Sequence, residues 1–442
     1  MDRERYFADL KEIFLAGLKA VEPAEAVSRA VKREGNRLVV GGKVYHLDDY
    51  ERIFVIGAGK AGAPMAQAME LLLGDRLTGG SVTVKYGHVS PVEKVAIEEA
   101  DHPIPDNKGI EATQKILSLA EQAGEKDLVF CLISGGGSAL LLCPSKGIGL
   151  KEKQAVTAEL LSCGASIGEI NAMRKHLSQV KGGQLARHCW PATTVTLILS
   201  DVVADPMDVI ASGPTVPDGS SFTGCMEIVS RYQIADKLPP AVMGILRKGA
   251  AGEIPENPKE GDSIFEKVHN QIVGNNLTAI KDAAEKAKAL GYNPLILSTR
   301  IEGETRDVAK AHAGIFQEVR ANGLPLSPPA CILSGGETTV TIKGKGKGGR
   351  NQEFSLAVAL AIQGEERIFF LCAGTDGNDG PTDAAGAFAD GTTVARGEAQ
   401  GLSALHYMDE NNSYPFFEAL GDLLITGPTN TNVMDLRIGL IV

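Results

Sequence analysis

The fold is most clearly indicated by one stretch of the chain, Arg52-Ile-Phe-Val-Ile-Gly-Ala-Gly-Lys-Ala-Gly62. Its first half, residues 52–56, is an apolar run typical of a buried strand, and its glycines lead directly into a helical pattern over residues 61–73. A strand, a glycine turn and a helix in this order form one β/α unit, the building block of a mostly parallel sheet.

The same alternation continues along the whole chain. A helical pattern precedes it until Pro23, and residues 37–46 read as a small hairpin with a Gly-Gly turn. The further elements that we expect are strands at 80–86, 127–133, 193–199, 269–274, 294–298, 330–342, 367–373, 422–426 and 437–442, and helices at 107–123, 277–290, 304–321 and 351–363, with two more between 150 and 179. This pattern predicts an α/β protein with a doubly wound, Rossmann-like sheet that helices cover on both faces.

Length and composition indicate two domains. The chain has 442 residues, and the segment 249–263 is rich in Gly and Pro, acidic and nearly free of large apolar residues, as surface connections between domains are. We therefore predict a larger N-terminal Rossmann-like domain over residues 1–248 and a smaller, mixed α/β domain over residues 264–442. The pattern leaves open whether the last strand returns to the first domain.

Charge, hydropathy and cysteine usage exclude several classes of partner. The net charge is −11 and the only basic tract is the short run 343–347, which argues against nucleic acid as a partner. The chain has no run of 18 apolar residues that would predict a membrane span, its charged N-terminus lacks the apolar pattern of a secretory segment, and its seven cysteines are isolated along the sequence. We expect a cytoplasmic protein with small-molecule partners; the sequence does not decide the oligomeric state, and a homodimer remains open.

The glycine turn after the first strand of this sheet formally matches the dinucleotide pattern G-x-G-x-x-G, with Gly57 and Gly59 as its first glycines. A dinucleotide site typically has an acidic residue at the end of the second strand, where it binds a ribose hydroxyl. Here that strand ends in Lys85 and Tyr86. Lys60 lies in the turn at the start of a helix, where the helix dipole already favours an anion. Contact with a phosphate is the favoured interpretation, ahead of a nicotinamide cofactor or a structural turn.

A second glycine-rich turn, Ser134-Gly135-Gly136-Gly137-Ser138, follows the strand at 127–133. Consecutive glycines leave backbone N–H groups free to point at a phosphate, and the flanking hydroxyls can add hydrogen bonds. The alternative is a closely packed turn at the sheet edge. Walker A, G-x-x-x-x-G-K-[ST], does not occur in the chain.

An acidic loop follows the strand at 367–373, with the sequence Gly374-Thr-Asp-Gly-Asn-Asp-Gly-Pro-Thr-Asp-Ala-Ala-Gly386. Its carboxylates Asp376, Asp379 and Asp383 would repel each other without a cation among them. Arg350 comes from a basic loop upstream and heads a helix, where its charge opposes the dipole and so indicates an anionic ligand. Acidic and basic loops together predict a phosphate handled with a metal ion, and the spacing does not fit an EF-hand.

Other polar residues at strand ends have two interpretations each. Asp201 is a candidate metal ligand or general base, but an aspartate there is also a common turn or cap residue. Asn275 has equal claims as a phosphate contact and as a helix cap. Glu337 is a carboxylate beside glycine at a bend after residue 334.

These loops, in this order, resemble the MOFRL-type, or class II, glycerate 2-kinases over nearly the whole chain. The matching blocks are Gly57-Ala-Gly-Lys-Ala, Ser134-Gly-Gly-Gly-Ser-Ala, Leu199-Ser-Asp-Val, Ser212-Gly-Pro-Thr, Ser334-Gly-Gly-Glu-Thr, Gly348-Gly-Arg-Asn-Gln-Glu and the acidic loop. The resemblance implies phosphorylation of D-glycerate to 2-phosphoglycerate with ATP and Mg²⁺, in a cleft between the two domains. It also implies that Lys60 and Arg350 are catalytic.

On this basis we expect three groups of site residues besides the catalytic pair. The nucleotide phosphates would contact Gly57, Gly59, the loop from Ser134 to Ser138, and Asn275. The substrate would contact Arg350, Glu337, Thr375 and Asp379. Asp201 and Asp376 would hold Mg²⁺ or orient the attacking hydroxyl, and the sequence does not separate those two roles. Because some relatives are called hydroxypyruvate reductases, an NAD(P)H-dependent reductase is the alternative, and a non-catalytic sensor of sugar acids is a third.

Overall fold

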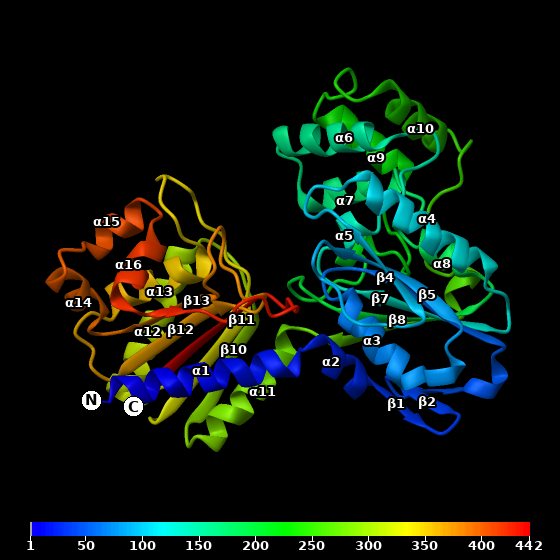
Figure 1. Ribbon diagram of the computed structural model, residues 1–442. Coiled ribbons are helices and arrows are strands. Elements are labelled where there is room, and N and C mark those ends of the chain that lie inside the picture. Colours follow the sequence, from blue (N-terminus) through cyan, green and yellow to red (C-terminus); the bar gives the residue numbers. More distant parts are fainter. Residues whose placement is uncertain (1) are drawn as a thin grey trace. The chain divides into compact units, whose positions relative to one another are not determined.

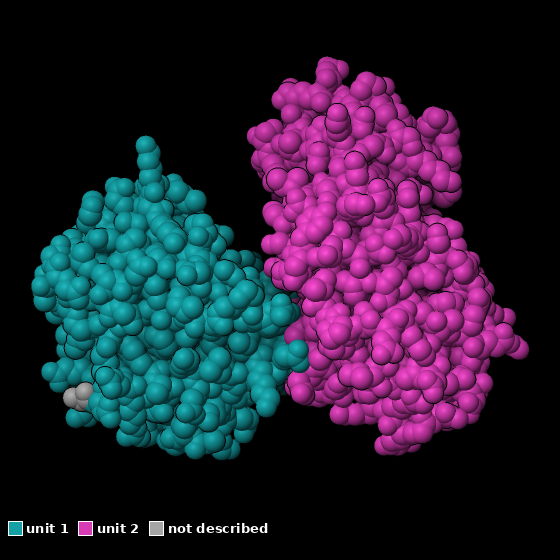
Figure 2. Space-filling view, viewed as in Figure 1, with its two compact units in different colours: residues 1–22, 201–204, 274–442 teal, residues 23–200, 205–273 magenta. Residues whose placement is uncertain are grey.

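The computed structural model describes residues 2–442 and divides into two compact units, coloured separately in Figure 2. Unit 1 comprises the N-terminal segment up to Glu22, residues 201–204 and the segment Gly274–Val442. Unit 2 comprises Pro23–Ser200 and Asp205–Val273. The N-terminal helix thus belongs with the C-terminal half of the chain.

This division differs from the boundaries predicted at 248 and 264. Helix α1 (Arg3–Ala20) packs against helix α11 (Asn276–Ala289) of unit 1, with Gly17 lying against the carbonyl of Ala279. The stretch 249–263 is not a free connection, because Asn257 is buried in unit 2 and donates a 2.7 Å hydrogen bond to Asp218. Glu256 and Lys259 of this segment also form hydrogen bonds to unit 2, and composition does not report such contacts.

The main sheet of unit 2 has six strands in the order β6-β5-β4-β7-β8-β9. These strands are β4 (Arg52–Ala58), β5 (Gly79–Lys85), β6 (Val95–Ala100), β7 (Asp127–Ile133), β8 (Thr193–Leu199) and β9 (Val268–Gly274). Strand β4 pairs in parallel with β5 and β7, β5 with β6, and β7 with β8. The predicted doubly wound parallel sheet is therefore confirmed. Its order reverses between β4 and β7, where Rossmann-type sheets bind ligands.

Helices of unit 2 cover this sheet and extend beyond it (Figure 1). Those that pack on the sheet or its ends are α3 (Gly62–Leu73), α4 (Asn107–Gln122), α5 (Gly137–Leu140) and α8 (Gln184–Cys189), and α2 (Pro23–Ala30) packs on α3. Those that share a separate apolar core are α6 (Leu150–Ser162), α7 (Ile167–His176), α9 (Phe222–Arg231) and α10 (Pro240–Ala250). The predicted hairpin is part of a three-stranded antiparallel sheet, β1 (Val31–Glu34), β2 (Arg37–Val40) and β3 (Lys43–His46).

The sheet of unit 1 is mixed, with the order β10-β11-β15-β12-β13-β14. Its strands are β10 (Asn293–Ile301), β11 (Ala330–Gly336), β12 (Ile368–Gly374), β13 (Gly386–Asp390), β14 (Leu423–Leu424) and β15 (Asp435–Ile441). Only β10 and β11 pair in parallel, and β15 lies between β11 and β12, antiparallel to both. The last strand of the chain therefore stays at the centre of the C-terminal sheet and does not return to the first.

Helices cover both faces of this second sheet (Figure 1). The pair α1 and α11 lies on one face, and α12 (Thr305–Asn322) and α13 (Arg350–Ala361) lie on the other. Three short helices follow, α14 (Thr393–Ala399), α15 (Ala404–Asp409) and α16 (Ser413–Leu420). Phe354 of α13 stacks on Phe370 of β12 in the core between them, with ring centroids 5.6 Å apart.

Some elements differ from the sequence prediction. Strands β6 and β13 were not predicted, because β6 is interrupted by two glutamates and β13 consists mostly of Gly and Ala. The strand predicted at 330–342 ends at Gly336, whose φ of 117° turns the chain out of the sheet. All seven cysteines are free thiols. Among the described residues, no helix combines the length and apolarity that a membrane crossing needs.

Candidate active site

The two glycine-rich turns of unit 2 lie side by side, since they follow the neighbouring strands β4 and β7. The backbone N–H of Lys60 donates to the carbonyl of Gly135 at 2.8 Å, and the N–H of Ala61 donates to Ser134 Oγ at 3.0 Å. Both turns open helices at the point where the strand order reverses. The sequence prediction placed them separately, and the sheet brings them together.

Close packing explains the first two glycines. A Cβ on Gly57 would lie 2.1 Å from the carbonyl oxygen of Leu132, and one on Gly59 would lie 2.1 Å from Ser134 Oγ. Ser134 and these glycines therefore hold the two turns together, as the structural alternative proposed. The N–H groups of Gly135 and Gly136, in contrast, donate to no acceptor within residues 2–442, which leaves them available to an anion.

Positive charge gathers around these turns. Neither Lys60 nor Lys85 makes a side-chain hydrogen bond or ion pair with another described residue. His88 Nδ1 lies 3.2 Å from the carbonyl oxygen of Lys60 and donates to it. Burial, and after it the charges of Lys60 and Lys85, lowers the pKa of His102 to about 4. A neutral histidine beside two unpaired lysines leaves net positive charge at the carboxyl edge of the sheet, where an anion would bind.

Arg350 opens helix α13 in unit 1, and carboxylates of its own unit hold it. Its Nε and Nη2 lie 2.7 and 2.9 Å from the two oxygens of Asp435, and its Nη1 lies 2.7 Å from Glu337. Burial lowers the pKa of Arg350, but Asp435 and then Glu337 outweigh burial and raise it above its ordinary value. The opposition between the arginine and the helix dipole is thus relieved by the fold itself.

Glu337 collects the charge of three further acidic residues. Burial raises its pKa; Arg350 opposes this, and Asp435, Asp201 and Asp376 add to the increase. Arg350 therefore lies within an excess of negative charge. The structure brings the predicted residues Glu337, Asp201 and Asp376 into one electrostatic environment around Arg350.

Three other predicted residues have structural contacts. Asp379 is buried and caps helix α13, accepting from the backbone N–H groups of Asn351 and Gln352 at 3.1 and 2.8 Å. Thr375 is buried and donates to the carbonyl of Met434 at 2.7 Å. Asn275 caps helix α11 by accepting from the N–H of Thr278 at 3.0 Å, so it has the helix-cap geometry that the sequence left as an alternative.

The negative charge around Glu337 would suit a divalent cation, although the described residues do not form a complete set of ligands for one. Residues 2–442 contain no group of three or more His, Cys, Asp or Glu side chains arranged to hold a metal ion. Mg²⁺ is usually bound by one or two carboxylates together with substrate phosphates and water. The carboxylates of Asp201 and Asp376 suit that manner of binding.

Sequence reasoning missed Asp435, which holds Arg350. Asp435 is fully buried at the start of β15, and Arg437 lies two residues further, 1% exposed. Arg437 Nη2 is 3.5 Å from Asp435, and its guanidinium lies over the ring of Phe354. The signal was present, because charged residues inside an apolar strand need partners. Lys85 and His102 were missed since only the parallel pairing of β5 and β6 brings them to the turns.

Comparison with known proteins places the chain among similar families and structures. Residues 9–247 match the family described as a domain of unknown function, DUF4147, and residues 330–435 match the MOFRL family. The chain is 41% identical to a glycerate 2-kinase of Pyrococcus horikoshii over 98% of each chain. It is 42% identical to a putative hydroxypyruvate reductase of Agrobacterium vitis, over 87% of this chain and 98% of that one.

Among solved structures, a glycerate kinase of Thermotoga maritima superposes with a TM-score of 0.90 at 40% identity, over 99% of this chain and 100% of that one. Both family models match in the order in which the two sheets occur along the chain. The chain therefore belongs to the MOFRL-type glycerate kinase family and is an enzyme of the kinase class.

Proposed function

We propose that this kinase phosphorylates D-glycerate with ATP to give 2-phosphoglycerate. The observation that carries the proposal is Lys60, an ammonium with no ion pair among the described residues, at the helix start where the sheet order reverses. Such a charge suits a phosphoryl group. The names of the relatives called glycerate kinase suggest glycerate as the acceptor of that group.

In-line phosphoryl transfer needs little covalent chemistry from a protein, so its residues mainly position groups and neutralise charge. The free N–H groups of Gly135 and Gly136 would hold phosphate oxygens of the nucleotide, and Lys60 would neutralise charge on the transferred group. Arg350, kept in place by Asp435, would bind the carboxylate of glycerate or the transferred phosphoryl group. The contacts of Asp379, Thr375 and Asn275 favour supporting roles over direct ones.

When bound, Mg²⁺ would supply charge neutralisation on the phosphate oxygens. Asp201 and Asp376 are the residues that would hold it. One of them could instead orient the attacking hydroxyl, and separate Asp→Asn variants assayed against Mg²⁺ concentration distinguish these roles. Loss of a metal ligand raises the Mg²⁺ requirement, while loss of an orienting residue lowers turnover at any Mg²⁺ concentration.

The direct test is an ATP- and Mg²⁺-dependent assay on D-glycerate, coupled through enolase, pyruvate kinase and lactate dehydrogenase. The coupling responds to 2-phosphoglycerate only. We expect a signal that disappears without D-glycerate. ADP release without that signal would indicate another acceptor position, and no ADP release would refute the kinase assignment.

The alternative is an NAD(P)H-dependent hydroxypyruvate reductase, a name that one relative carries. The end of β5 bears Lys85 where a dinucleotide site would want an acid for the ribose hydroxyl. A titration of NADH followed by its fluorescence tests this alternative directly. We expect no saturable binding.

A further inference from the structure

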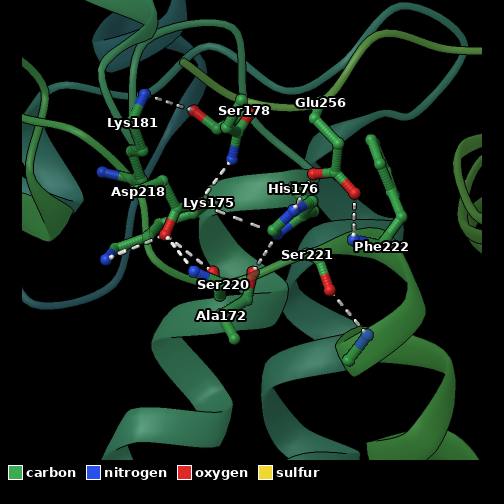
Figure 3. Close-up of polar contacts among 12 residues, drawn as sticks. Ala172, Lys175, His176, Ser178, Lys181, Asp218, Ser220, Ser221, Phe222 and Glu256 are labelled. Atoms are coloured by element: carbon green, nitrogen blue, oxygen red, sulfur yellow. Dashed lines mark hydrogen bonds and ion pairs between the residues drawn. The ribbon is translucent and has the colours of Figure 1, made fainter. Parts of the chain in front are cut away.

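Several ionisable groups near the end of helix α7 contact ionisable side chains of other segments (Figure 3). Lys175 Nζ lies 3.4 Å from Asp218 and 3.5 Å from Asp208, and His176 Nε2 lies 3.1 Å from Glu256. These contacts join α7 to the segments around residues 218 and 256. Charge pairing is therefore the rule in this part of unit 2.

Three neighbouring cations do not follow that rule. Lys181 is 1% exposed, and its Nζ donates to the carbonyls of Ser138 and Leu141 at 2.7 and 3.2 Å, with no carboxylate in contact among the described residues. Lys153 of α6 has a buried Nζ without any hydrogen-bond partner in residues 2–442. Arg174 of α7 is partly buried and makes no ion pair or side-chain hydrogen bond with another residue that the structure describes.

The backbone brings these three segments together. The chain around residue 144 runs antiparallel to the chain around residue 178, with a bridge between Pro144 and Ser178 and a 2.8 Å hydrogen bond from the N–H of Gln179 to the carbonyl of Cys143. Helix α6, which carries Lys153, packs with helix α7, which carries Arg174, in their shared apolar core. The charges also influence each other, because burial and then Lys153 and Arg174 lower the pKa of Lys181.

Burial does not simply neutralise Lys153. Burial, and then Arg174, lowers the pKa of Lys153 to about 8, so most of this amine still carries its proton at pH 7. An ammonium taken out of water without a partner is unfavourable. Lys153, Arg174 and Lys181 come from three segments and meet no carboxylate among the described residues, and a bound oxyanion would supply the missing negative charge.

We propose that Lys153, Arg174 and Lys181 form a binding site for a phosphate-type oxyanion, which takes a phosphoryl group of the nucleotide. Lys181 connects the site to Ser138, the last residue of the second glycine turn. The oxyanion site stands on the three unpaired cations alone. Its assignment to the nucleotide rests on the proposed kinase function.

The test is isothermal titration calorimetry of inorganic phosphate and of ADP with the full chain and three variants. Lys153→Met and Arg174→Met remove the proposed ligands and keep apolar side chains of similar length. Lys151→Met is the matched control, because Lys151 is exposed on the same helix. We expect at least a tenfold loss of affinity for both ligands in the first two variants and none in the control.

A second readout separates a ligand site from a structural one. Without ligand, Lys153→Met should melt at the same temperature as the wild type or higher, because it removes an unpaired buried charge. Lower melting with unchanged affinity for both ligands would overturn the site. Loss of phosphate binding with unchanged ADP binding would overturn the nucleotide assignment. Failure of the glycerate assay in the wild type is a separate outcome, since these measurements need no turnover.

Discussion

At the scale of single residues, this protein places charge in two contrasting ways. Arg350 is held by the carboxylates of Asp435 and Glu337, so its position is set before any ligand binds. Lys60 has no ion pair among the described residues, so its charge is available to a ligand. A preorganised arginine and an available lysine are complementary requirements of phosphoryl transfer.

Removing either charge should reduce turnover. We expect Lys60→Ala and Arg350→Ala each to lower kcat roughly 10²-fold or more, about 3 kcal/mol of transition-state stabilisation. The measurement is the coupled assay with D-glycerate, with circular dichroism to show that each variant folds. Lys108→Ala, an exposed lysine paired with Glu111 on α4, is the control. Wild-type turnover in folded Lys60→Ala would remove Lys60 from the mechanism.

The capping residue Asp379 should make stability depend on pH. Burial raises its pKa to about 7, against hydrogen bonds from Gln352 and Asn351 that lower it. Because the pKa of Asp379 is higher in the folded than in the unfolded protein, protonation of this carboxyl stabilises the folded state. The stabilisation is complete below about pH 4 and is lost as pH rises through 7. Its slope is at most about 1.4 kcal/mol per pH unit.

Asp379→Asn cannot titrate, so its stability relative to the wild type should increase from pH 4.5 to pH 7.5. Urea unfolding of both proteins at the two pH values measures this difference. An equal stability difference at both pH values would show that Asp379 is ionised in the folded protein throughout this range. The hydrogen bonds that it accepts at the start of α13 would then affect its pKa more than burial does.

At the scale of elements, the junction of β4 with β7 depends on glycines whose positions leave no space for a side chain. A side chain on Gly57 would meet the backbone of β7, which cannot move without opening the sheet. The helical core formed by α6, α7, α9 and α10 has more tolerance, since a methyl group added at Gly244 of α10 would meet no atom of another segment within 4 Å. The same residue type is therefore required in one element and dispensable in another.

Gly57→Ala and Gly244→Ala should change stability in opposite directions. We expect the first to lower the free energy of unfolding by about 1–3 kcal/mol, as overpacking typically does. The second should raise it by up to about 1 kcal/mol, because alanine is the better helix former. Chemical denaturation of both variants beside the wild type makes the comparison, and a stable Gly57→Ala would show that β4 and β7 can separate at this point.

At the scale of the whole molecule, the chain builds two units whose segments are not contiguous. Helix α1 belongs to the C-terminal unit, where Arg3 pairs with Asp390 and Asp422 and Gly17 packs on α11. The C-terminal sheet is in turn completed at its centre by the last strand, β15. Unit 1 therefore requires both ends of the chain to fold.

Gly17→Val should destabilise unit 1 selectively. A Cβ at this position would already lie 2.8 Å from the carbonyl oxygen of Ala279 and 3.1 Å from Leu436, so the helix must move away from α11. We expect hydrogen exchange to accelerate in α1, α11 and β15 and to remain unchanged in β4 and β7. Equal acceleration in both units would show that they unfold as one.

Local pattern was sufficient for much of the fold and for part of the site. Strands β7 and β8 have the predicted bounds, since seven-residue apolar runs between glycine and polar turns have few other structures available. The lysine in a glycine turn and the arginine at a helix start were visible as candidate residues for the same reason: their chemistry conflicts with their local setting unless a charged partner is present.

Tertiary structure alone decided the partners. Asp435 is far from Arg350 in sequence, and β15 reaches it only by entering the sheet between β11 and β12. The boundaries of the units, the cap that Asp379 places on α13, and the cluster of Lys153, Arg174 and Lys181 likewise depend on contacts between distant segments. The cap of Asn275 on Thr278, in contrast, is local. Periodicity and residue type report which groups a segment offers, whereas burial and pairing are properties of the assembled chain, because they depend on what the other segments place beside those groups.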